Sequence, residues 1–179
     1  MELPREVVRG AKFSFKCQRS GVCCSSGPNV TLTSYDICRI AKYMNVDWRE
    51  LVGKYVNAVV ADHIPVPFLR GERDRCIFLV KVNGLPSCSI YPARPLRCRL
   101  FPFIPYGPKV LDKMYVSSIC PGVGKGGEID PPWGDLEKYS EEVSDHYRRL
   151  YDLIFNKRYE PIKALEEVTD TVCKEISEL

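Results

Sequence analysis

The chain has 179 residues, a formal net charge of +3 at pH 7 and nine cysteines. This length predicts one domain with a core of its own, and the ordinary apolar content excludes a disordered chain. No run is long enough for a signal peptide or a transmembrane helix. We therefore expect a cytoplasmic protein, not in a membrane. Its cysteines should stay reduced, and so many reduced cysteines indicate metal binding.

The charge is divided unevenly along the chain. Residues 1–127 hold 19 Lys and Arg against 9 Asp and Glu, whereas residues 128–179 hold 7 against 14. The cysteine motifs all lie in the basic part. We predict a cysteine-cluster metal-binding domain over 1–127 and a helical extension over 128–179, packed on it as a single compact unit. Nucleic-acid binding is not supported, because no aromatic-basic repeat accompanies the charge.

The first predicted element is a short strand that contains Phe13 and Phe15. A Gly-Pro-Asn turn at 27–29 closes the first cysteine loop. Thr33 and Asp36 have the spacing of a capping box, and apolar residues at helical intervals predict a helix over about 36–45.

A second capping pattern, Asp47 with Glu50, predicts another helix from about Trp48 to Ala61. The prolines at 65 and 67 then indicate a loop.

The middle of the chain contains the clearest hairpin signal. The β-branched run 77–82 is followed by Asn83-Gly84 and a second short strand over about 85–90. This hairpin is expected to bring Cys76 and Cys88 together across the ladder.

Beyond the hairpin, the Pro92 to Pro95 run ends the strand and presents Cys98 on a tight turn or a single helical turn. A strand over 110–119 is expected to deliver Cys120 into the glycine-rich segment 122–127, which we interpret as a flexible link.

The C-terminal region predicts two helices, over about 135–155 and 161–176. We therefore expect an α+β fold that is mostly helical. Helices at both ends would surround the central β-hairpin and irregular cysteine-rich metal-binding loops.

Seven cysteines lie in the loops and strands and are the predicted metal ligands: Cys17, Cys23, Cys24, Cys76, Cys88, Cys98 and Cys120. Cys38 and Cys173 adjoin apolar helical stripes and are expected to be free core residues. Of the two histidines, His63 in a loop is a weak candidate ligand, and His146 in a charged helix is expected to be exposed to solvent.

These motifs resemble a known family. The pattern Cys17-x₅-Cys23-Cys24, followed by Cys76, by the run Cys88-Ser-Ile-Tyr-Pro-Ala-Arg-Pro-Leu-Arg-Cys98-Arg-Leu-Phe-Pro and by Cys120, is similar to the CxxCxxCC, or YkgJ-type, cysteine-cluster proteins. The resemblance implies zinc or iron chelation, and flagellin lysine-N-methylase is distantly similar. The family's second cysteine is Ser20 here, and a hydroxyl is a poor ligand for a soft metal.

Seven thiols do not identify the metal. Two tetrahedral zinc sites need eight metal–sulfur bonds, so one thiolate would have to bridge, whereas one [4Fe–4S] cluster needs four thiolates. Adjacent residues of an extended segment point in opposite directions, which argues against Cys23 and Cys24 sharing one ion. The related methylase favours an iron–sulfur cluster in a structural, redox or sensing role, with zinc as the alternative.

Four basic residues are predicted to contact the cofactor. Arg94, Arg97 and Arg99 flank Cys98 and can donate hydrogen bonds towards sulfur, and Lys125 lies among glycines that could bind an anion. The alternative function is a protein lysine N-methyltransferase, with S-adenosylmethionine as cofactor and a protein as substrate or partner. The sequence shows no nucleotide-binding fingerprint for it, and catalytic residues and oligomeric state stay open.

Overall fold

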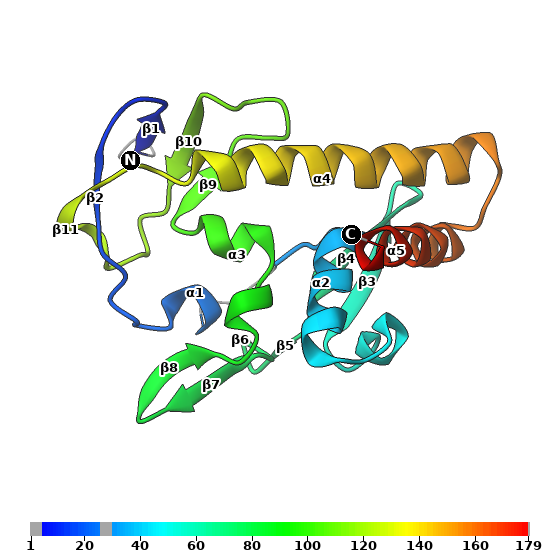
Figure 1. Ribbon diagram of the computed structural model, residues 1–179, viewed down its shortest axis with the longest axis horizontal. Coiled ribbons are helices and arrows are strands. Elements are labelled where there is room, and N and C mark those ends of the chain that lie inside the picture. Colours follow the sequence, from blue (N-terminus) through cyan, green and yellow to red (C-terminus); the bar gives the residue numbers. More distant parts are fainter. Residues whose placement is uncertain (1–4, 26–29, 179) are drawn as a thin grey trace.

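The chain combines five small antiparallel sheets with helices of very different lengths (Figure 1). The computed structural model describes residues 5–25 and 30–178. The strands pair in the orders β1-β10-β9, β2-β11, β3-β4, β5-β6 and β7-β8. Their bounds are β1 Glu6–Val8, β2 Phe13–Phe15, β3 Val56–Ala61, β4 Ile64–Leu69, β5 Gly71–Glu72, β6 Arg75–Cys76, β7 Leu79–Val82, β8 Leu85–Cys88, β9 Phe103–Pro105, β10 Lys113–Val116 and β11 Val123–Ile129. The helices are α1 Val22–Ser25, α2 Ser34–Met44, η1 Trp48–Leu51, η2 Tyr91–Ala93, α3 Leu96–Leu100, α4 Trp133–Tyr151, η3 Asp152–Asn156 and α5 Pro161–Ser177.

This mixture corrects the expectation of a mostly helical fold with helices at both ends. Of the two ends of the described chain, the N-terminal one is formed by strands β1 and β2, and only the C-terminal one is helical. The central hairpin β7–β8 is present, with Asn83-Gly84 as its two-residue turn. The predicted turn at 27–29 lies outside the described residues.

The predicted helix from Trp48 to Ala61 is wrong after its first turn. Its capping box is present, but the helix stops as the single 3-10 turn η1, and Gly53 then has a φ of +77°. Glycine adopts this left-handed conformation without a steric penalty, so it ends helices readily. The following β-branched valines favour a strand, and β3 pairs with β4 across the two-residue loop Asp62-His63.

The prolines at 65 and 67 were expected in a loop and instead lie inside β4. Proline has no N–H to donate, which confines it to places where the ladder does not need one. The carbonyl of Pro67 accepts a hydrogen bond from the Leu32 N–H at 2.8 Å. The segment before α2 therefore lies along β4.

Helix α2 confirms the prediction for residues 36–45. Thr33 and Asp36 form the reciprocal capping box, and Asn45 ends the helix in the left-handed conformation. The buried face carries Ile37, Ile40 and other apolar residues. Local sequence signals thus set both ends of this helix.

The last third of the chain follows the prediction with two corrections. The strand expected over 110–119 is the shorter β10, and residues 123–127 of the predicted flexible link are part of β11, which pairs with β2. Helices α4 and α5 are present near the predicted positions. Strand β11 continues through residue 127, where the sequence analysis divided the chain into a metal-binding domain and a helical extension. That division stays a prediction.

Three apolar clusters hold the elements together. The first packs α2 against β4 and the start of the β7–β8 hairpin, the second joins β2, α3, β9, β10 and α4, and the third joins α2, α4 and α5. Figure 1 shows α4 running across the molecule above α3 and α2. No helix within residues 5–25 and 30–178 is long and apolar enough to cross a membrane.

Cys38 and Cys173 are not free core residues, as the sequence suggested, but form a disulfide. Cys38 lies on α2 and Cys173 on α5, and 135 positions separate them along the chain. Both residues do pack in apolar clusters, so the predicted burial is right and the predicted thiol state is wrong. The bond fixes α5 to α2 covalently.

His146 on α4 is fully buried, contrary to the expectation of solvent exposure. Its Nδ1 accepts a hydrogen bond from the Ser34 N–H at 3.2 Å, and within the described chain its Nε2 has no hydrogen-bond partner. Burial, which disfavours the charged imidazolium, lowers the pKa of His146 from 6.5 to about 4. The imidazole is therefore neutral in the folded protein.

Acidification below pH 6.5 is expected to destabilise the fold through His146. The unfolded chain takes up a proton near pH 6.5, whereas the folded chain does so only near pH 4, so stability is full above 6.5 and falls progressively down to about 4. The loss is at most about 3 kcal/mol. Urea titrations of metal-free protein at several pH values measure it. A His146→Gln variant should show a shallower slope over this range, and an unchanged slope would contradict the assignment.

Candidate metal centre

Five of the seven predicted ligands come together, and we call Cys23, Cys24, Cys76, Cys88 and Cys98 the thiol cluster. They lie on α1, at the end of β6, at the end of β8 and on α3. Figure 1 shows these four elements gathered on one side of the molecule, below α4. Burial raises the pKa of Cys98 and of Cys88, and the charges of Cys76 and Cys23 raise both further, so these sulfurs are near enough for their charges to interact.

A glycine sets the position of α1. Gly21 has a φ of +73°, and a Cβ at this position would come within 2.7 Å of the Pro86 Cβ on β8. Only glycine therefore allows the loop to lie this close to the hairpin. The Gly21 carbonyl accepts the Cys24 N–H at 2.9 Å and so begins the helical turn. Arg19 adds a hydrogen bond to Ser87 Oγ on β8 at 3.1 Å.

The hairpin presents Cys88 differently from the prediction. Cys88 pairs with Leu79 in the β7–β8 ladder, whereas Cys76 lies on β6 opposite Gly71. The two cysteines therefore do not face each other across one ladder. They still belong to the same cluster, because Cys76 is part of the first apolar cluster and Cys88 packs against it.

Backbone amides point towards two of the sulfurs. Burial raises the pKa of the Cys76 thiol, and the N–H groups of Phe78 and Leu79 oppose that effect. The N–H of Ile90 does the same for Cys88, where burial again raises the pKa. Amides that donate to sulfur stabilise thiolate, the form that binds a metal.

Cys23 and Cys24 are held side by side with their sulfurs 3.7 Å apart. The sequence argument treated them as an extended segment with opposed side chains, and that premise is wrong because both lie in the helical turn α1. A hydrogen bond from the Cys24 thiol lowers the pKa of Cys23 to about 7, and the charge of Arg94 also lowers it. The pKa of Cys24 is raised by the same bond and by burial.

The donor set fits a soft metal ion or an iron–sulfur cluster, since all five side chains are thiols. Across the described residues, no three Cys, His, Asp or Glu side chains already surround one point as metal ligands. Binding a single ion would thus require some of these thiols to move closer together.

The four basic residues that were predicted to contact the cofactor lie in three different surroundings. Arg94 lies 3.8 Å from the centroid of the Tyr91 ring. Its charge adds to the hydrogen bond from Cys24 in lowering the pKa of Cys23, and it opposes the burial that raises the pKa of Cys88. Arg97 and Arg99 instead turn to α4, where Arg97 donates to Tyr139 Oη at 3.4 Å and Arg99 pairs with Asp135. Lys125 is exposed on β11. Among these four described cations, Arg94 is the one whose charge acts on Cys23 and Cys88.

Cys17 and Cys120 lie at one end of the β2–β11 pair. Cys17 follows β2 and Cys120 precedes β11, and the Lys16 N–H donates to the Gly122 carbonyl at 3.1 Å between them. Their assignment as ligands stays a prediction. Ser20, at the family's missing cysteine position, accepts the Val22 N–H at 3.4 Å.

His63 occupies the turn between β3 and β4 with a φ of +68° and is exposed.

Asp36 is the residue near the centre that the sequence reasoning undervalued. It was identified only as part of the α2 capping box, yet its carboxylate also accepts the N–H of Leu96, the first residue of α3. The available signal was Pro95, which has no side-chain acceptor with which to cap the helix that carries Cys98.

Comparisons with known proteins agree with the cysteine pattern. Residues 16–121 match the CxxCxxCC family, described as "Putative zinc- or iron-chelating domain". The uncharacterized protein MJ0661 of Methanocaldococcus jannaschii is 32% identical over 94 residues, which are 51% of this chain and 46% of that protein. The chain thus spans less than half the length of this curated relative. No solved structure matches. The matched range includes the seven cysteines and more than half of the chain, which therefore belongs to the CxxCxxCC family of metal-chelating domains.

Proposed function

We propose that this protein is an iron–sulfur protein, with one [4Fe–4S] cluster held by Cys24, Cys76, Cys88 and Cys98. The cluster would serve a structural, redox or sensing role. A [4Fe–4S] cluster takes four thiolates, one on each iron, and so accepts ligands spread around a larger object than a single ion. Cys23, which is exposed beside Cys24, would be the spare thiol.

The observation that carries this proposal is the convergence of thiols from four separate elements. Cys76 is part of the first apolar cluster, and Cys24 and Cys88 pack against it. Cys98, on α3, lies near enough to Cys76 and Cys88 for their charges to act on it. Amides aimed at Cys76 and Cys88 would donate to cluster-bound sulfur. Such a centre would link α1, β6, β8 and α3, so its binding free energy would add to the stability of the fold.

A mononuclear zinc site is the second candidate, and the Cys23–Cys24 pair favours it. Zn–S bonds of about 2.3 Å at tetrahedral angles place two sulfurs about 3.8 Å apart. The observed distance of 3.7 Å between the sulfurs of Cys23 and Cys24 matches this sulfur–sulfur separation. In this alternative both neighbours bind one ion, together with two of the three remaining thiols of the cluster.

Metal and sulfide analysis after anaerobic purification separates the two candidates. The iron–sulfur proposal predicts about four irons and about four acid-labile sulfides per chain, with a broad visible absorption band. About one zinc per chain, without sulfide or colour, would establish the second candidate and overturn the first. A chain with neither metal would contradict both.

The proposal assigns the protein to the cytoplasm, where thiol ligands stay reduced, although the Cys38–Cys173 disulfide is unusual for that compartment. The alternative of a protein lysine methyltransferase is tested by titration with S-adenosylmethionine. Micromolar binding would support it, together with a protein substrate.

A further inference from the structure

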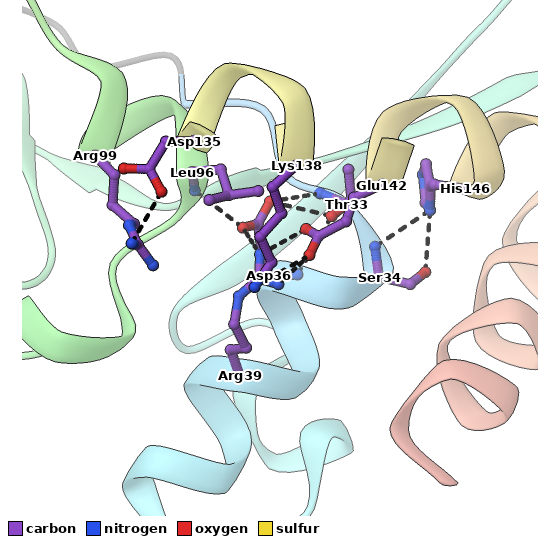
Figure 2. A network of polar contacts seen from close by, with 10 residues as sticks. All are labelled: Thr33, Ser34, Asp36, Arg39, Leu96, Arg99, Asp135, Lys138, Glu142 and His146. Atoms are coloured by element: carbon purple, nitrogen blue, oxygen red, sulfur yellow. Dashed lines mark hydrogen bonds and ion pairs between the residues drawn. The ribbon is translucent and has the colours of Figure 1, made fainter. Parts of the chain in front are cut away.

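Helix α3, which carries Cys98, begins without a cap of its own. Leu96 is its first residue, and the preceding Pro95 makes no side-chain capping bond. The first N–H groups of a helix have no partner inside the helix and need one from elsewhere when they are buried. Here Asp36 Oδ1, from α2, accepts the Leu96 N–H at 3.1 Å (Figure 2).

Every acceptor position of Asp36 is used. Oδ1 also accepts Arg39 Nη2 at 2.6 Å, while Oδ2 accepts the Thr33 N–H at 3.0 Å and the Thr33 hydroxyl at 3.2 Å. A carboxylate offers about four acceptor sites, so this one is saturated. With 4% of its surface exposed, Asp36 has little freedom to rotate away from Leu96.

The buried charge is compensated. Arg39 binds Asp36 and also pairs with Glu142 of α4 at 2.6 Å, and Lys138 lies 4.0 Å from the same Glu142 carboxylate (Figure 2). Two buried carboxylates thus face two cations. Paired buried charges are tolerated, whereas removal of one partner leaves the other uncompensated.

The backbone of Cys98 is fixed by the same short helix. The Pro95 carbonyl accepts the N–H groups of Cys98 at 2.9 Å and of Arg99 at 3.0 Å. Arg99 also pairs with Asp135 of α4 at 2.9 Å. The start of α3 is therefore tied to α2 by Asp36, and its last turn is tied to α4 by Arg99.

We propose that Asp36 is a positioning residue for the metal centre: one carboxylate caps α2 and α3 together and so holds Cys98 in place before metal binds. This inference rests on the proposed function, since it gives Cys98 a metal to bind. It does not depend on whether the metal is zinc or an iron–sulfur cluster. Outer-shell residues that orient ligands commonly change metal affinity by about ten- to a hundredfold.

The test compares Asp36→Asn with Thr33→Ala in the metal-loaded protein. The asparagine cannot accept all four hydrogen bonds and removes one of the two carboxylates that pair with Arg39, so Cys98 should lose its anchor. Thr33→Ala removes a capping hydroxyl from the same network and leaves the Asp36–Leu96 bond intact. The readout is the rate at which iron or zinc passes from the protein to a competing chelator. We expect this release to be at least about tenfold faster in Asp36→Asn than in the wild type. Release in Thr33→Ala should stay within about twofold of the wild type.

Equal acceleration in both variants would reduce Asp36 to a general stabilising role and overturn the proposal, as would unchanged release in Asp36→Asn. If the wild-type chain binds neither iron nor zinc, the proposed function fails and the positioning role fails with it. Normal loading with unchanged release refutes the positioning role alone. Should Asp36→Asn not fold, amide hydrogen exchange of the metal-free wild type decides. The Leu96 amide should be protected, and exchange at the rate of a free amide would refute the anchor.

Discussion

Replacement of Cys98 by serine is expected to remove most of the bound metal and to lower the melting temperature. Cys98 is the one member of the thiol cluster on α3, so no neighbouring thiol on that element can substitute for it. A hydroxyl is a weak ligand for the soft metals that thiolates bind. Because metal binding contributes directly to folding, we expect the free energy of unfolding to fall by more than about 4 kcal/mol. Metal analysis and thermal unfolding of the same samples measure both effects.

Metal-free protein provides the control for this variant. Without metal, wild type and Cys98→Ser should unfold at similar temperatures, because serine is close to cysteine in size. Cys17→Ser serves as a comparison, since Cys17 is exposed and lies outside the thiol cluster, and it should retain more metal than Cys98→Ser. If Cys98→Ser kept its full metal content and stability, Cys98 would not be a ligand.

Removal of the Cys38–Cys173 disulfide is expected to produce the second large effect. The bond closes a segment of 135 positions, and cross-links across long loops strongly restrict the unfolded chain. A double Cys38→Ala, Cys173→Ala variant should lose about 2–5 kcal/mol of unfolding free energy, as measured by urea titration. Its metal content should not change, because neither residue belongs to the thiol cluster.

Reduction of the wild type offers an independent check on the disulfide. Wild-type protein unfolded with a strong reductant present should match the double variant, which should itself not respond to the reductant. Identical stability of wild type and double variant under oxidising conditions would mean that the bond does not form in the native protein.

The sequence predicted those elements whose signals are local. Helix α2 carries its own capping box and left-handed C-cap, and the β7–β8 hairpin carries Asn83-Gly84 at its turn. Strand β3 was not predicted, because the capping box at Asp47 and Glu50 indicated a long helix there. The capping box is present, but it starts only one helical turn. The hairpin loop after β3, Asp62-His63, adopts positive φ values without a glycine to indicate them.

The candidate centre was only partly predictable, because its geometry depends on contacts between remote elements. Residue type alone identified the thiols, but only the fold shows that Cys23, Cys76 and Cys88 lie near enough to Cys98 for their charges to act on it. The disulfide was hidden for the same reason, since two cysteines 135 positions apart in apolar helices look like core residues. The role of Asp36 depends on α2 lying beside α3, which no local pattern encodes.

Alkylation of cysteines, read by mass spectrometry with and without metal, tests the convergence of the thiols most directly. In the metal-loaded protein, Cys24, Cys76, Cys88 and Cys98 should be protected together, and all four should become reactive once a chelator has removed the metal. Exposed Cys17 should react in both states and so serve as the internal reference. Reaction of these four thiols at the same rates in both states would show that they do not share a metal centre.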